Sequence, residues 1–120
     1  MRNSRIKIVL LVAGVAAVLV ALVVFYVQYI RPVMIRNEYA TMAHRAEQAY
    51  RQYAATHSAE DLSRGPCVAE NLVSGWVADI VHNPRQAIDD LPQNQCANYL
   101  NGTATHFVEL DPQGNVIRIH

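Results

Sequence analysis

Residues Ile8–Val27 read IVLLVAGVAAVLVALVVFYV, a run without a charged or strongly polar side chain. In a helix each residue advances the chain by about 1.5 Å, so twenty residues span roughly 30 Å, the thickness of the hydrocarbon core of a bilayer. The run also lacks histidine, cysteine, acids and bases, so it cannot ligate a haem through an imidazole or relay protons. The sequence therefore predicts a transmembrane helix over residues 8–30, preceded by a short tail at 1–7.

A cleaved signal peptide is the main alternative, because Arg2, Arg5 and Lys7 form a positively charged start. The apolar core of a signal peptide is usually about 7–15 residues long and leads into a small-x-small cleavage site. Here the run is longer and bulky aromatic residues follow it, which is typical of a membrane interface. We therefore expect an uncleaved span with the bilayer as partner. Its interfacial residues would be Arg5, Lys7, Phe25, Tyr26, Tyr29 and Arg31.

The distribution of charge and cysteine predicts the orientation. Three basic residues and the α-amine precede the span, whereas Arg31 and Arg36 follow it, which favours a cytoplasmic N-terminus. All ten acids and both cysteines, Cys67 and Cys96, lie after the span. A cysteine pair in a small domain is typical of an oxidising compartment. We expect a bacterial inner membrane with the C-terminal domain in the periplasm, and no nucleic-acid partner, because no basic cluster lies beyond the anchor.

An amphipathic juxtamembrane helix is predicted for residues 31–57, with Pro32 either kinking the helix or opening a new one. Its apolar seam repeats at spacings of three and four residues. The seam would pair with another helix as a coiled coil or be buried by the chain's own C-terminal domain. Two alanines and two tyrosines over fewer than three heptads make a poor coiled coil, which favours burial. The seam residues are Ile35, Tyr39, Met42, Ala46, Ala49 and Tyr53.

Residues 58–120 are expected to form a small α+β domain with short helices. Between residues 68 and 81 the apolar residues pair one turn apart, which favours a helix, although Gly75 and the β-branched residues leave a strand open. Asn83-Pro84-Arg85-Gln86 is typical of a helix start, with Asn83 as the N-cap. That short helix would end near Leu91, before Pro92.

A three-stranded antiparallel meander is predicted at the C-terminus, over residues 96–100, 103–110 and 115–120. Asn101-Gly102 would form the first hairpin turn and Asp111–Gly114 the second. Pairing of Leu110 with Asn115 would oppose Val108 to Ile117 and His106 to Ile119. The face toward the helices would then hold Tyr99, Ala104, Val108, Leu110, Ile117 and Ile119. The other face would hold Phe107, Val116 and the diagonal neighbours Glu109 and Arg118.

The residues capable of chemistry have no catalytic or metal-binding spacing. None of the five histidines stands in an HxH or HExxH pattern, the serines lack a GxSxG context, and no glycine-rich phosphate loop occurs. Cys67 and Cys96 are too far apart for a CxxC redox pair, so a structural disulfide is expected, contributing about 3–4 kcal/mol. We therefore predict no enzyme activity, metal or cofactor. The sequence identifies no small-molecule substrate and leaves open whether the domain binds a ligand.

Two sets of residues are candidates for contact with other membrane-protein subunits. Small side chains on one face of the span would let another helix approach closely, and these are Ala13, Gly14, Ala17 and Ala21. Large aromatic residues beyond the span are candidates for a partner interface, although burial in the domain core is the simpler interpretation of the single tryptophan. These are Tyr39, Tyr50, Tyr53 and Trp76.

The layout resembles that of type IV pilins and pseudopilins: an apolar N-terminal helix with a proline near its end, an amphipathic continuation, and a disulfide-bearing β domain ending in a hairpin such as LDPQGNVIRI. The resemblance implies a filament or secretion subunit. The chain departs from that family's processing motif, because no glutamate precedes Glu38. The leading expectation is therefore a non-enzymatic accessory or structural subunit of a larger inner-membrane complex, an energy-transducing assembly being one example, with the pilin-like subunit as the alternative.

Overall fold

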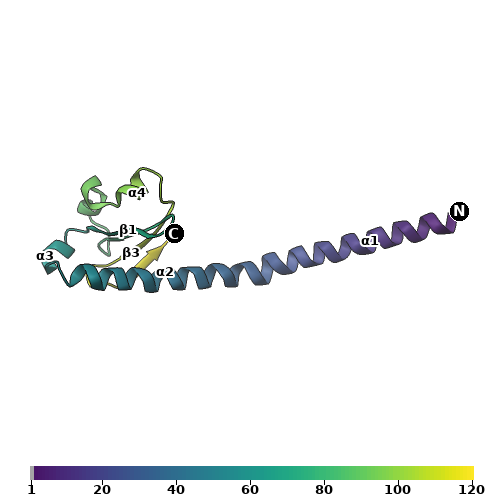
Figure 1. The fold of residues 1–120 in the computed structure, drawn as a ribbon, viewed down its shortest axis with the longest axis horizontal. Coiled ribbons are helices and arrows are strands. Elements are labelled where there is room, and N and C mark those ends of the chain that lie inside the picture. Colours follow the sequence, from purple (N-terminus) through teal and green to yellow (C-terminus); the bar gives the residue numbers. More distant parts are fainter. Residues whose placement is uncertain (1) are drawn as a thin grey trace. The chain divides into compact units, whose positions relative to one another are not determined.

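The computed structural model describes residues 2–120, which belong to two compact units, one ending at Glu38 and the other comprising Tyr39–His120. The fold is α+β, as predicted, with a long N-terminal helix followed by a mixed sheet (Figure 1). The helical elements are α1 (Arg2–Phe25), η1 (Tyr26–Ile30), α2 (Arg31–Ala54), α3 (Ala59–Leu62), η2 (Ala87–Asp90), η3 (Pro92–Asn94) and α4 (Ala97–Leu100). The strands are β1 (Cys67–Val73), β2 (Trp76–Ile80), β3 (His106–Leu110) and β4 (Val116–Ile119).

The predicted apolar helix is present and is the one described helix that is long and apolar enough to cross a membrane. Its apolar side chains have no protein around them: those between Ile8 and Phe25 that are large and hydrophobic are 52–68% exposed. Burying an aliphatic side chain is worth about 1.5–3 kcal/mol. A surface of this kind therefore needs an apolar environment from outside the chain.

Helix continuity is maintained through Pro32 by the π-helical turn η1. Proline lacks an N–H donor, and in a regular α-helix its ring would clash with the carbonyl four residues earlier, that of Gln28. In η1 the Arg31 N–H instead donates to the Tyr26 carbonyl, five residues back. Such a turn is wider than an α-helical turn and leaves room at this point. The chain therefore passes from α1 into α2 without a break.

Helix α2 ends at Ala54, three residues before the predicted end at 57. Beyond it, the Thr56 N–H donates to the Tyr53 carbonyl, and the ring of His57 stacks on that of Tyr53 with 3.7 Å between centroids. Ser58 then caps the next helix, α3, in a capping box with Asp61.

The predicted three-stranded antiparallel meander is wrong, because the sheet has four strands in the order β1-β2-β3-β4. Strands β1 and β2 pair antiparallel, β2 and β3 pair parallel, and β3 and β4 pair antiparallel. The parallel pair requires a long crossover connection, which runs over residues 81–105 and contains η2, η3 and α4. Figure 1 shows the sheet between α2 and this connection.

The helix favoured for residues 68–81 is also wrong, since this segment forms the β1–β2 hairpin around Ser74-Gly75, with Val73 paired to Trp76. Strand β2 has the burial pattern of a central strand: four of its five residues are buried. Both faces of β2 are covered, so both carry apolar residues and the period of two that marks a strand is lost. Without that alternation, the spacing of the apolar residues favoured a helix over a strand.

Residues 97–100, predicted as a strand, form the helix α4. Its turn closes with the Asn101 N–H donating to the Ala97 carbonyl and the Gly102 N–H to the Tyr99 carbonyl. Asn101-Gly102 therefore ends a helix instead of forming a hairpin. In the preceding segment Asn83 is not an N-cap: the helix expected there is the 3-10 helix η2, which starts at Ala87 and has its capping box between Gln86 and Asp89.

The last hairpin is present with the predicted turn, but β3 begins at His106 instead of residue 103, and the register differs. Val108 pairs with Ile119 and Leu110 with Val116, and an irregularity between these pairs makes Ile117 an extra residue on β4. The bulge moves Val116 onto the face toward α2 and removes Ile117 from it. At the turn, the Asp111 carboxylate accepts the N–H groups of Gln113 and Asn115.

The main core lies between α2 and one face of the sheet. Met42 and Ala46 from α2 pack with Trp76, Ala78, Val108 and Leu110, and Tyr39 and Tyr50 border them. The predicted burial of the helical seam by the chain's own domain is confirmed for this part of α2. The hydroxyl of Tyr50 donates to the Pro112 carbonyl at 2.8 Å. Its ring lies against Gly114, whose φ of +89° and lack of a side chain permit this approach.

Candidate functional site

The opposite face of the sheet carries a cluster of charged and aromatic side chains. On neighbouring parallel strands Val77 pairs with Phe107 and Asp79 with Glu109. Because side chains alternate along a strand, these four point away from the face that holds Ala78 and Val108. The register thus places two carboxylates side by side on the covered centre of the sheet.

Glu109 is the centre of an ion-pair network. Its side chain is 7% exposed, and Arg118, directly opposite on β4, donates to its two carboxylate oxygens at 2.6 Å each. Arg85, from the crossover connection, donates to Glu109 Oε1 at 2.9 Å and to Asp90 at 2.9 Å. A buried carboxylate costs much free energy unless it is paired, and two guanidinium groups meet that requirement here. The predicted proximity of Glu109 and Arg118 is confirmed, as direct rather than diagonal neighbours.

Asp79 differs from Glu109 because one of its carboxylate oxygens, Oδ1, is buried without a hydrogen-bond partner among the described residues. Burial, together with the charge of neighbouring Glu109, raises the pKa of Asp79 to about 7, against the lowering effect of Arg85 and Arg118. A buried polar atom left unpaired costs roughly 1–3 kcal/mol. Such an atom is a candidate for contact with a ligand or solvent.

A cavity of about 100 Å³ lies over Asp79 and Glu109. Its apolar walls are Val77, Cys96, Tyr99 and Phe107. Its polar walls are Asp79, Arg85, Gln95, Glu109 and Arg118. The rings of Tyr99 and Phe107 meet edge to face with 5.2 Å between centroids, and the Arg118 guanidinium lies 4.8 Å from the centre of the Phe107 ring. The cavity combines aromatic walls with a few converging polar groups, as small-molecule sites do.

Asp89 positions the connection that carries Arg85. Only 1% of Asp89 is exposed, and its carboxylate accepts the N–H groups of His82 and Gln86 and contacts His82 Nδ1 at 2.8 Å. Burial alone would raise the pKa of Asp89, but these hydrogen bonds outweigh it and hold the pKa below its usual value. The bonds to His82 and Gln86 fix the chain on both sides of Arg85.

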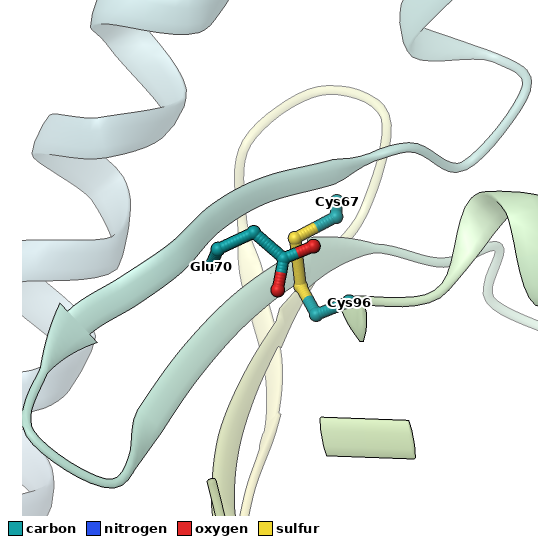
Figure 2. Close-up of side chains that lie close together, drawn as sticks. All are labelled: Cys67, Glu70 and Cys96. Carbon is teal, nitrogen blue, oxygen red and sulfur yellow. A yellow bond between two sulfur atoms is a disulfide. The ribbon is translucent and has the colours of Figure 1, made fainter. Parts of the chain in front are cut away.

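The predicted disulfide joins Cys67 on β1 to Cys96 at the start of α4, with 4.9 Å between the Cα atoms. Figure 2 shows the Glu70 carboxylate beside it. The ligand atoms of these three residues lie within 4.8 Å of one another, a spacing compatible with a metal ion. However, the two sulfurs are bonded to each other, and Glu70 accepts the N–H groups of Ala97 and Asn98 at 2.8 and 2.9 Å. The arrangement is a clamp that holds α4 on β1.

The residues predicted for membrane and partner contact occupy two environments. The four small residues of α1 are exposed, and so are the predicted interfacial residues, which lie on α1, η1 and the start of α2. The small residues are Ala13, Gly14, Ala17 and Ala21, and the interfacial residues are Arg5, Lys7, Phe25, Tyr26, Tyr29 and Arg31. The four aromatic candidates belong to the folded domain. Trp76 is 5% exposed and packs between His106, at 4.7 Å, and Tyr39, at 6.0 Å between ring centroids.

The cavity was not among the sites predicted from the sequence. Asp79 and Arg85 fall in segments that were expected to be helices, so nothing placed them beside Glu109. The one available signal was an acid within the apolar run GWVADIV, since an acid flanked on both sides by buried residues is unusual. Comparison of the chain with protein-family models, with curated proteins and with solved structures found no match.

Proposed function

We propose that this protein is a single-pass membrane protein acting as a non-enzymatic accessory subunit of a larger complex in a bacterial inner membrane. The observation that carries the proposal is the contrast between its two units. The domain packs a core of its own, whereas the large apolar side chains of α1 are exposed and require lipid or other helices. A bilayer meets that requirement along residues 8–27, and a partner helix meets it in part.

The proposed orientation places the N-terminus in the cytoplasm and the sheet domain in the periplasm. Arg5 and Lys7 precede the apolar run, and basic residues next to a span favour the cytoplasmic side. The Cys67–Cys96 disulfide supports the same orientation, because such bonds persist in oxidising compartments.

The proposed contact with a partner is the face of α1 formed by Ala13, Ala17 and Ala21. These residues are four apart, so they lie on one side of the helix, where small side chains allow a second helix to approach. The aromatic residues Tyr39 and Trp76 are engaged in the domain's own packing, which makes the span the stronger candidate for the main contact.

Native mass determination after mild detergent extraction tests this function. Wild-type protein should leave the membrane in a complex heavier than one chain. Ala17→Phe should be released from that complex, while the sheet domain stays folded. Leu19→Phe is the matched control, because residue 19 lies about 200° around the helix from residue 17. If the wild-type chain is extracted alone, or if Ala17→Phe remains bound and deletion of the domain also leaves the complex intact, the accessory-subunit function is wrong.

The second candidate, a pilin-like subunit, is favoured by one packing feature. The C-terminal part of α2 packs along one face of a disulfide-stapled sheet that ends in the β3–β4 hairpin. A filament subunit would leave the membrane and assemble through α1. Surface filaments that disappear on deletion of the gene would support this candidate and contradict the accessory-subunit function.

A further inference from the structure

We propose that the cavity over Asp79 and Glu109 binds a small neutral ring bearing hydroxyl groups, such as one saccharide unit. This site is separate from the face of α1 to which the proposed function assigns partner contact, so the two proposals stand independently. Three properties of the cavity define the ligand: its size, its balance of charge and the chemistry of its walls.

The cavity is too large for a single water and suits a small ring. A volume of about 10–15 Å³ on this measure holds one water molecule, whereas the cavity has about 100 Å³. Its rim is accessible, since the side chains of Arg85 and Arg118 are 39% and 56% exposed and Tyr99 is 39% exposed. A ligand of about one ring therefore has both space and an entry path.

The charges around the cavity favour a neutral ligand over an ion. Arg85 and Arg118 are matched by Asp90 and Glu109 in the ion-pair network. An anion entering the cavity would meet Asp79 and Glu109, and a cation would meet the two guanidinium groups, so each would face repulsion in a site of low dielectric. A neutral ligand avoids the larger cost of burying a charge and disturbs none of these pairs.

The polar groups left over match hydroxyl groups. Asp79 Oδ1 is buried and unpaired, and it accepts a hydrogen bond from any hydroxyl that reaches it. The ion pairs of Arg85 use Nε and Nη1, and those of Arg118 use Nε and Nη2. One terminal nitrogen of each guanidinium thus remains to donate to a ligand oxygen. A polyhydroxylated ring both donates and accepts, as this set requires.

The aromatic walls supply the apolar contact. Tyr99 and the half-buried Phe107 both line the cavity, and their rings are nearly perpendicular to each other, so aromatic surface forms part of its wall. The C–H face of a saccharide ring packs against such surfaces, which are common in small-molecule sites. The Arg118 guanidinium lies over the Phe107 ring and contributes to the same wall of the cavity.

Titration by NMR tests the proposal. The full-length chain, ¹⁵N-labelled in lipid nanodiscs to avoid glycoside detergents, is titrated with methyl β-D-glucopyranoside and N-acetyl-D-glucosamine. Sodium acetate and methylammonium chloride serve as charged probes. We expect saturable shifts of the Asp79, Tyr99 and Phe107 amides with at least one of the sugars and none with the ions. The proposal is overturned if neither sugar gives saturable shifts, or if an ion does so instead.

Variants connect any binding to this cavity. Asp79→Leu removes the unpaired carboxyl, and Tyr99→Ala removes an exposed wall without touching the sheet core; each should weaken sugar binding at least tenfold. Glu60→Gln, which alters a carboxylate that is 80% exposed on α3, is the matched control and should bind like wild type. If Asp79→Leu fails to fold, Tyr99→Ala decides the test. Wild-type affinity in the variants that fold would show that the sugar binds elsewhere and would overturn the proposal.

Discussion

Among single residues, Asp79 and Glu109 occupy paired positions on adjacent strands, but their carboxylates differ in whether they have partners. Glu109 is paired with Arg85 and Arg118, whereas Asp79 has a buried oxygen without a partner among the described residues and a pKa raised to about 7. Two adjacent carboxylates in a covered site repel each other when both are charged. The two arginines pair with Glu109. Asp79 is left to bind a proton or to accept a hydrogen bond from another group.

The first prediction concerns Asp79→Asn. The pKa of Asp79 is about 7 in the folded chain against 3.8 as the reference value, so folding takes up a proton between these pH values. Wild-type stability therefore falls as the pH rises from about 4 to about 7. Asparagine does not titrate, so the free energy of unfolding of the variant relative to wild type should rise by about 3 kcal/mol between pH 5 and pH 8. The measurement is urea unfolding of both proteins, followed by the fluorescence of Trp76.

Trp76 is suited to this measurement, because it is the single tryptophan and is buried in the domain. Asp61→Asn gives a comparison, since hydrogen bonds from Ser58 hold the pKa of Asp61 below its usual value. Its difference from wild type should not change between pH 5 and pH 8. An advantage of Asp79→Asn that stays constant, or shrinks, over this range would contradict the burial of an uncompensated carboxyl.

Among the helices and strands, those with one covered face could be predicted from the residue pattern, whereas a strand covered on both faces could not. The helical seam, the Asp111–Gly114 turn and the disulfide each have a local signal, and each was found. Strand β2 has none, because both of its faces are buried. The cavity could not be predicted for the same reason, because Asp79 lies in β2. In addition, Arg85 lies in the crossover connection, whose path is not specified by local sequence patterns.

The second prediction concerns the clamp between β1 and α4. Replacing both cysteines, Cys67→Ser with Cys96→Ser, opens a loop with a sequence separation of 29 residues. Loss of a crosslink of that size should lower the free energy of unfolding by about 3–4 kcal/mol. Urea unfolding followed by Trp76 fluorescence measures it. Wild-type protein treated with a dithiol reductant is the control and should lose a similar amount. An unchanged midpoint in both samples would show that the domain does not depend on the bond.

At the scale of the whole molecule, the two units have different requirements. Residues Tyr39–His120 bury a core between α2 and the sheet and add a disulfide, as small domains often need. The unit ending at Glu38 is a helix whose large apolar side chains are exposed. The proposed role as a membrane-anchored subunit would meet both requirements, because a bilayer would cover the exposed helix while the domain folds around its own core.

The proposed topology is that the helix crosses the membrane once and holds the disulfide domain outside the cytoplasm. Its most direct test is a fluorescent reporter that folds only in the cytoplasm, fused after His120, beside the same reporter fused before the first residue. We expect a dark C-terminal fusion and a bright N-terminal fusion, with both proteins present in the membrane fraction. A bright C-terminal fusion would contradict it, because the domain would then lie in the reducing compartment.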